Sequence, residues 1–195
     1  MLRFQHTALA CLLGALLAAG AQAATVTLAD VKYADSVKVQ DAALLLNGAG
    51  IRYKAVFKVY TAGLYLEQKA GTPQDVFALP GNKRLSITML REIDSGELGK
   101  LFSRGMEDNM DRASFSKLIP GVLRMSQIFS DHKKLEAGDT FTIDWVPGKG
   151  TIITVKGVVQ GEPFKEPAFF NALLGIWLGN KPADWKLKDA LLGKE

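Results

Sequence analysis

The sequence predicts an α+β fold in which helices pack on one face of an antiparallel sheet. Three observations lead to this prediction. The first third of the chain is rich in short strand-like segments, the middle has helical periodicity, and an alternating hairpin pattern precedes a last pair of helices. Strands that come in one run and helices in another are typical of α+β domains.

The first third predicts strands. Thr25–Leu28 and Ser36–Val39 are short and rich in β-branched residues, and 42–46 is a short apolar run. Residues 51–66 predict one long strand, because apolar residues occupy every second position over its first part. We interpret Gly48-Ala49-Gly50 as a tight turn that precedes this strand.

The middle of the chain predicts helices. Thr72-Pro73 begins a short helix that runs to residue 79, and 84–90 follows as a strand. Asp94 or Ser95 caps a helix with an apolar stripe. Ser114 or Ser116 begins another helix that reaches Phe129, with Pro120 placed in its first turn.

The end of the chain predicts a hairpin and two more helices. Residues 140–146 and 151–159 alternate around a Pro-Gly-Lys-Gly turn, which is typical of a β-hairpin. An apolar helix over 169–178 stops at Gly179, and 184–192 forms a last short helix.

The N-terminal 23 residues have the pattern of a secretory signal peptide. Arg3 precedes an apolar run over 8–19, and Ala21-Gln22-Ala23 supplies the small residues of a cleavage site. The run is shorter than the roughly 20 residues that span a bilayer, so we expect no stable membrane anchor. We therefore expect a signal peptide at 1–23, a single domain at 24–195, and a periplasmic location.

Composition excludes several kinds of chemistry from the exported chain. Its only cysteine is Cys11 and one of its two histidines is His6, so both leave with residues 1–23. A disulfide, a thiol nucleophile and a Ser-His-Asp triad are thereby disfavoured, and we expect no metal and no cofactor. The formal net charge is +4 for the whole chain. It falls to about +3 without Arg3, and no basic stripe indicates nucleic-acid binding.

Arg52 and Tyr60 are the first candidate site residues. Both lie at even positions of the long predicted strand, with Lys54 and Lys58 between them. One interpretation is a solvated strand face. The other is a strand that runs from solvent into a covered region, where a guanidinium and a phenol hydroxyl share one pocket.

Asn109 is the next candidate. It lies on the apolar stripe of the first long helix with Phe102 and Met106, at helical spacing. A buried amide must be hydrogen-bonded, so Asn109 is either satisfied by the backbone or available to a ligand. Met106 is either a core residue or a flexible contact for an alkyl ligand.

Two motifs resemble a known family. The sequence Asn47-Gly48-Ala49-Gly50-Ile51-Arg52, continued by 58–67, resembles the chalcone isomerase superfamily, in particular its exported bacterial branch. The segment Leu173-Leu174-Gly175-Ile176-Trp177-Leu178-Gly179-Asn180-Lys181-Pro182 is similar to the same branch. The resemblance implies an open-faced β-sandwich, with a large antiparallel sheet, helices layered on one face and a cleft between them.

The resemblance also implies what the site does. In the plant enzymes an arginine stabilises developing enolate charge during ring closure, and in fatty-acid-binding relatives an arginine and a tyrosine hold a carboxylate. Arg52 matches the arginine, Asn109 the helix asparagine, and Tyr60 the tyrosine of the fatty-acid-binding type. Phe102 and Phe170 stand where the enzymes have hydroxyl residues.

We therefore expect a non-catalytic periplasmic binding protein for a small amphipathic molecule such as a fatty acid. An isomerase or intramolecular lyase acting on a chalcone-like enone is the alternative, and a structural or partner-binding envelope protein is the second alternative. The expected ligand contacts are Arg52, Tyr60, Phe102, Met106, Asn109 and Phe170.

Overall fold

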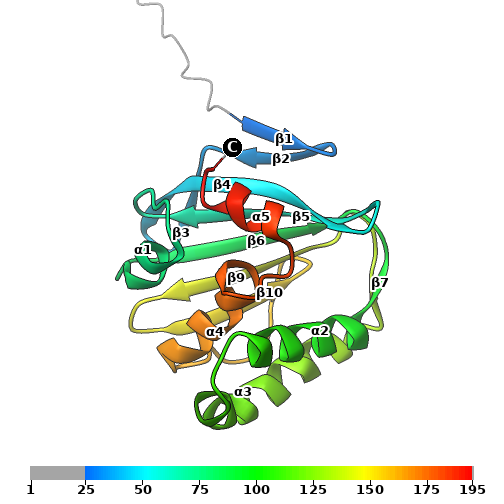
Figure 1. The fold of residues 1–195 in the computed structure, drawn as a ribbon, viewed down its shortest axis with the longest axis vertical. Helices are drawn as coiled ribbons and strands as arrows, with labels where there is room; N and C mark the ends of the chain where they lie inside the picture. The colour runs from blue at the N-terminus through cyan, green and yellow to red at the C-terminus, as the bar shows by residue number, and fades with distance from the viewer. Residues whose placement is uncertain (1–24, 195) are drawn as a thin grey trace, which may run out of the picture.

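The computed structural model describes residues 25–194, so the predicted signal peptide at 1–23 lies outside the described residues. A seven-stranded antiparallel sheet in the order β11-β10-β9-β6-β5-β4-β3 forms the centre of the molecule (Figure 1). Its strands are β3 Ser36–Val39, β4 Ala42–Lys54, β5 Phe57–Leu66, β6 Lys83–Met89, β9 Thr140–Val146, β10 Gly150–Val155 and β11 Val158–Val159. Two small ribbons pair β1 Thr25–Leu28 with β2 Val31–Ala34, and β7 Ile93–Asp94 with β8 Lys134–Leu135.

Helices cover one face of this sheet. In Figure 1, α4 and α5 lie in front of the strands, and α2 and α3 run side by side along the lower part of the molecule. The helices are α1 Pro73–Ala78, α2 Ser95–Asp108, α3 Arg112–Ser130, α4 Pro167–Leu178 and α5 Trp185–Leu191. This arrangement confirms the predicted α+β class with helices on one face of a large antiparallel sheet.

The inner strand β5 is buried on both faces from Val59 onward. Its side chains Tyr60, Ala62 and Leu64 belong to the main core under the helices, whereas Tyr65 belongs to a smaller core on the other face. The β1–β2 ribbon contributes Tyr33 to that second core, where the Tyr33 hydroxyl donates to Thr61 Oγ1 at 2.8 Å. Burial on both faces explains why 59–66 contains almost no charged residue.

The prediction of one strand over 51–66 is wrong. The chain turns at Ala55 and Val56, so β4 and β5 form a hairpin in which Lys54 pairs with Phe57. Two-residue loops usually contain Gly, Asn or Asp, because one or both residues need a positive φ. Here Ala55 takes that conformation, with a φ of 53°. The loop therefore lacks the residues that predict a turn.

The predicted tight turn at Gly48-Ala49-Gly50 is also absent, because these residues lie within β4. A Cβ on Gly48 would meet the Ala190 carbonyl oxygen at 2.0 Å, and one on Gly50 would meet Ala190 Cβ at 2.7 Å. The two glycines therefore let α5 pack directly on the backbone of β4. The pairing of β4 with β5 shifts register between Leu46 and Gly48, which is typical of a β-bulge.

Buried Asn47 holds the strand at this register shift. Its Nδ2 donates to the Ala70 carbonyl at 2.9 Å and to the Leu191 carbonyl at 2.8 Å, and its Oδ1 accepts from the Ala70 N–H at 2.7 Å. Each of these bonds links segments that are far apart in the sequence. The Asn-Gly-Ala-Gly motif thus fastens the C-terminal helix to the sheet.

Two smaller expectations also need correction. Pro120 lies inside α3, which begins at Arg112, and not in a first turn. The strand predicted over 151–159 divides into β10 and β11, because Lys156 and Gly157 take positive φ values of 51° and 80° and form a turn. The run predicted over 42–46 is the first part of β4, and the other predicted elements are present with ends that differ by a few residues at most.

We predict that Gly48→Ala destabilises the fold by about 1–3 kcal/mol, because the added methyl group displaces the backbone of α5. Urea unfolding followed by circular dichroism measures this change. Gly71→Ala is the matched control, since a methyl group added at Gly71 would meet nothing within 4 Å. Equal stability of the two variants would contradict the close packing of α5 on β4.

Candidate functional site

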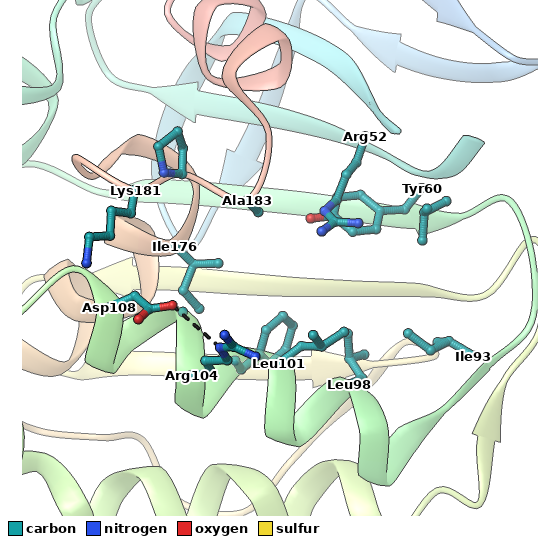
Figure 2. Close-up of a pocket in the computed structure, with 14 residues that line it drawn as sticks. Arg52, Tyr60, Ile93, Leu98, Leu101, Arg104, Asp108, Ile176, Lys181 and Ala183 are labelled. Carbon is teal, nitrogen blue, oxygen red and sulfur yellow. Dashed lines mark ion pairs between the residues drawn. The ribbon is translucent and has the colours of Figure 1, made fainter. Parts of the chain in front are cut away.

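A cavity of about 190 Å³ lies between the β4–β5 hairpin, α2 and the segment that joins α4 to α5. Figure 2 shows Arg52 and Tyr60 on the sheet side, and Leu98, Leu101, Arg104 and Asp108 along the facing side of α2. The volume is below the roughly 300–1,000 Å³ of pockets for drug-sized ligands, so it suits a small molecule. The lining residues are Arg52, Val59, Tyr60, Ile93, Leu98, Leu101, Phe102, Arg104, Gly105, Asp108, Ile176, Lys181, Pro182 and Ala183.

The hairpin brings Arg52 and Tyr60 together. They are cross-strand partners of β4 and β5, and the Arg52 guanidinium carbon lies 5.7 Å from the centre of the Tyr60 ring. The sequence led us to place both on one face of a single strand. The structure instead places them side by side by pairing across a turn.

The charge at the cavity mouth is mainly positive. Among residues 25–194 the Arg52 side chain makes no ion pair and no hydrogen bond to another side chain or to the backbone, and it is half-buried. Arg104 and Lys181 add two exposed cations, and the one lining carboxylate, Asp108, lies 3.7 Å from Arg104. An anionic group at Arg52 would meet a net positive field.

Tyr60 is an uncharged hydrogen-bond donor at neutral pH. Burial raises the pKa of its hydroxyl to about 12, although the nearby Arg52 charge and the bond from Trp177 oppose this rise. Trp177 Nε1 donates to the Tyr60 oxygen at 2.8 Å. The Tyr60 proton finds no acceptor within the described residues, so the hydroxyl can donate to an oxygen of a ligand.

Phe102 and Met106 form the apolar side of the site. Phe102 lines the cavity and makes edge-to-face contacts with Phe129, Phe141 and Trp177 at centroid distances of 5.1 to 5.8 Å. Met106 is fully buried in the core and is not a lining residue. Its role as a ligand contact stays a prediction, and its position is that of a core side chain.

Asn109 and Phe170 do not line the cavity. The Asn109 amide ends α2, donates to the Gly105 and Lys181 carbonyls at 2.9 Å, and accepts from the Lys181 N–H at 2.7 Å. Asn109 thus holds the wall segment, residues 181–183, at Lys181. Its amide has few hydrogen bonds left to offer a ligand. Phe170 packs with Trp145 and beneath Lys83, in a different part of the core. The structure therefore brings together Arg52, Tyr60 and Phe102, but not the other three candidates.

Sequence reasoning missed several residues that build the site. Trp177 belongs to the motif that carried the resemblance, yet only the fold shows that its indole reaches Tyr60. Ile176, directly before Trp177, and the segment 181–183 after it form one wall of the cavity. Arg104 lies on the polar side of the α2 pattern, and no signal in the sequence marks it.

The described residues give no sign of a metal centre or of a spanning helix. No three His, Cys, Asp or Glu side chains between residues 25 and 194 are grouped so that they could hold a metal ion. In the same part of the chain, no helix has the length and apolar character needed to cross a membrane.

The fold and site together define a class of protein: an antiparallel sheet with helices on one face, and an apolar cavity between them that opens beside an arginine. The family model for chalcone isomerase-like proteins matches residues 24–193, and the chain belongs to that family. This confirms the resemblance to chalcone isomerase-like proteins at the level of the family.

A solved structure supports the same fold. The chain is similar to a fatty-acid binding protein of Arabidopsis thaliana, with a TM-score of 0.68 and 14% identity over 87% of this chain and 96% of that one. At this identity the likeness concerns the fold. No curated protein matches the chain significantly.

We predict that Tyr60→Phe destabilises the protein by about 1–3 kcal/mol at pH 7, because the buried Trp177 N–H loses its acceptor. The folded state holds the Tyr60 proton to about pH 12, against an ordinary pKa of 10.0. Its contribution to stability is therefore complete below pH 10 and is lost as pH rises toward 12. The stability difference between parent and variant should shrink over that range.

Urea unfolding at pH 7, 10 and 11.5 tests this prediction. Tyr53→Phe is the control, because Tyr53 is exposed and its hydroxyl makes no hydrogen bond among the described residues. Tyr65, whose pKa is also raised to about 12, is present in every variant and so cancels from the comparison. If the free energy of unfolding of Tyr60→Phe changes with pH as that of the control does, the buried hydrogen bond contributes nothing to stability.

Proposed function

We propose that this protein binds a small amphipathic acid, with the carboxylate at Arg52 and the apolar part in the cavity. The observation that carries the proposal is a half-buried arginine with no partner among the described residues, at the edge of an apolar cavity. A guanidinium forms two parallel hydrogen bonds to a carboxylate, and such charge-assisted bonds are stronger than neutral ones.

Tyr60 supports the same assignment. A deprotonated phenol would repel an anion, but its raised pKa keeps the hydroxyl neutral, and its proton has no acceptor in the described part of the chain. The Tyr60 hydroxyl would donate to one carboxylate oxygen while Arg52 engages the other. The fatty-acid binding protein with the similar fold is consistent with this ligand class.

The cavity dimensions favour a short apolar chain. At about 190 Å³ the cavity is smaller than the roughly 300–1,000 Å³ of pockets that hold drug-sized ligands. Buried Leu98, Phe102 and Ile176 line this space, and the aromatic cluster around Phe102 closes it from within. An acid with six to eight carbons or so therefore fits better than a long-chain fatty acid.

Binding is favoured over catalysis by the chemistry of the lining. Tyr60 carries the only hydroxyl among the described lining residues, and the Asn109 amide is engaged by the backbone. Few groups remain to position a water or move a proton. In a purely structural protein we would expect Arg52 to form an ion pair at the surface. Among the described residues it forms none.

We predict that Arg52→Ala weakens octanoate binding at least about tenfold, since a hydrogen bond to a charged group contributes roughly 1.5–3 kcal/mol. Isothermal titration calorimetry of residues 24–195 measures the change. Arg112→Ala is the matched control, because Arg112 is exposed at the start of α3 and lies outside the cavity. Methyl octanoate, which has no charge, should be insensitive to Arg52→Ala.

Three results would overturn this assignment. Octanoate could bind equally to parent and Arg52→Ala, or not bind to the parent at all. Alternatively, the parent could cyclise a chalcone above the background rate while Arg52→Ala does not, and the protein would then be an enzyme of the isomerase type.

The proposal also includes export to the periplasm, which rests on the signal-peptide pattern at 1–23. We predict that expression of the full chain in a Gram-negative bacterium releases a mature protein by osmotic shock, and that N-terminal sequencing begins at Ala24. Changing Ala21 and Ala23 to bulky residues should leave the precursor uncleaved. Recovery of an uncleaved chain from the cytosol would contradict export.

A further inference from the structure

A second surface of the molecule has no role in the proposed binding of an acid. This surface is the hairpin tip, formed by Tyr53, Lys54, Val56, Phe57 and Lys58 of the β4–β5 hairpin together with Arg91. The hairpin tip combines exposed apolar side chains with cations. We propose that the hairpin tip docks on the surface of an anionic lipid bilayer.

The apolar side chains of the hairpin tip are unusually exposed. Val56 is 83% and Phe57 57% accessible, and Tyr53 is 40% accessible. Two-residue hairpin loops normally carry small or polar residues, and Ala55-Val56 takes their place even though Ala55 must adopt a positive φ. Neither core of the protein includes Val56 or Phe57. The fold therefore supplies no reason for these apolar residues.

Three cationic side chains surround the exposed apolar side chains of the hairpin tip. Lys54 and Lys58 flank it along the hairpin, and the Arg91 guanidinium lies 4.9 Å from the centre of the Phe57 ring. Among residues 25–194 none of the three makes an ion pair. The acids next to the tip are engaged elsewhere: Glu92 pairs with Lys134 at 2.7 Å, and Asp184 accepts from the Tyr53 N–H and caps α5.

This combination matches a lipid surface better than a protein partner. Apolar and aromatic side chains enter the boundary between headgroups and acyl chains, while lysines and arginines interact with anionic headgroups. A stable protein interface buries roughly 800 Å² on each side, which a projecting two-residue loop with its three apolar side chains does not offer. Charge complementarity and the small convex shape therefore favour the bilayer.

The hairpin tip lies next to the cavity, so docking would place the cavity near the bilayer. Arg52 lies only three residues before the Ala55-Val56 loop and Tyr60 only four after it, which is about 10–13 Å along a strand. A tip held at the headgroups would bring the cavity mouth close to the bilayer surface. An amphipathic acid would then have a short path between membrane and cavity. The docking itself does not depend on what the cavity binds.

Co-sedimentation with sucrose-loaded vesicles tests the proposal, using residues 24–195, which include every described element. Vesicles of phosphatidylcholine alone are compared with vesicles of equal parts phosphatidylcholine and phosphatidylglycerol. We expect binding to the anionic vesicles that weakens with added salt. The double variant Val56→Ser/Phe57→Ser should bind at least about tenfold more weakly. Lys54→Gln and Lys58→Gln should each lower the affinity about fivefold.

Matched controls separate the hairpin tip from general surface effects. Leu123→Ser removes an apolar side chain with 65% exposure from α3, and Lys117→Gln removes an exposed lysine that has no described ion pair. Both should bind vesicles like the parent. The tip variants should keep the parent's melting temperature and octanoate affinity, so failure of docking and failure of acid binding are measured separately.

Several results would overturn the docking proposal. The parent could fail to bind anionic vesicles, bind neutral vesicles equally well, or bind no more tightly than the tip variants. Sedimentation velocity adds one more outcome. If the parent is a dimer that Val56→Ser/Phe57→Ser converts to a monomer, the hairpin tip is an interface between two copies of this chain instead.

Discussion

The close packing of α5 on Gly48 and Gly50 of β4 determines how the sheet side of the cavity meets the wall formed by residues 181–183. Gly48 and Gly50 leave no room for a Cβ, and Asn47 binds the Leu191 carbonyl at the end of α5. At its other end α5 is capped by Asp184, which also accepts from the Tyr53 N–H of β4. The wall segment 181–183, which precedes α5, is thereby placed opposite α2, where the Asn109 amide holds it at Lys181. This packing therefore positions the wall of the cavity that faces α2.

The same arrangement suits Arg52 to the anchoring role that we propose for it. Arg52 lies two residues before the end of β4, so its backbone is fixed by the sheet while its guanidinium reaches the cavity edge. Beneath it, the bond from Trp177 fixes the Tyr60 ring, and burial keeps its hydroxyl neutral. The Tyr60 side chain, held in this way, loses little entropy on binding of the proposed ligand, and the ordering of side chains is one of the costs of association.

The elements that carried local signals were predictable from the sequence. Thr72 and Asp184 cap the helices that they were expected to begin, and the Pro-Gly-Lys-Gly turn joins β9 to β10. The β4–β5 turn was not predictable, because Ala55-Val56 contains none of the Gly, Asn or Asp residues that usually mark a two-residue loop. Within the site, the Arg52–Tyr60 neighbourhood was foreseen but its geometry was not. The positions of Asn109 and Phe170 depend on which distant segments they meet, and residue type alone does not reveal this.

The missed turn and the exposed hairpin tip have one cause. In most proteins local residue choice agrees with the fold, and departures from that agreement concentrate at functional sites. Glycine at position 55 and a polar residue at 56 would suit the backbone better, yet the chain has Ala and Val there, with Phe57 following. The Phe57 ring contacts Arg91 at the surface and contributes to neither core. Because this departure does not stabilise the fold, its explanation lies in what the hairpin tip contacts outside the molecule.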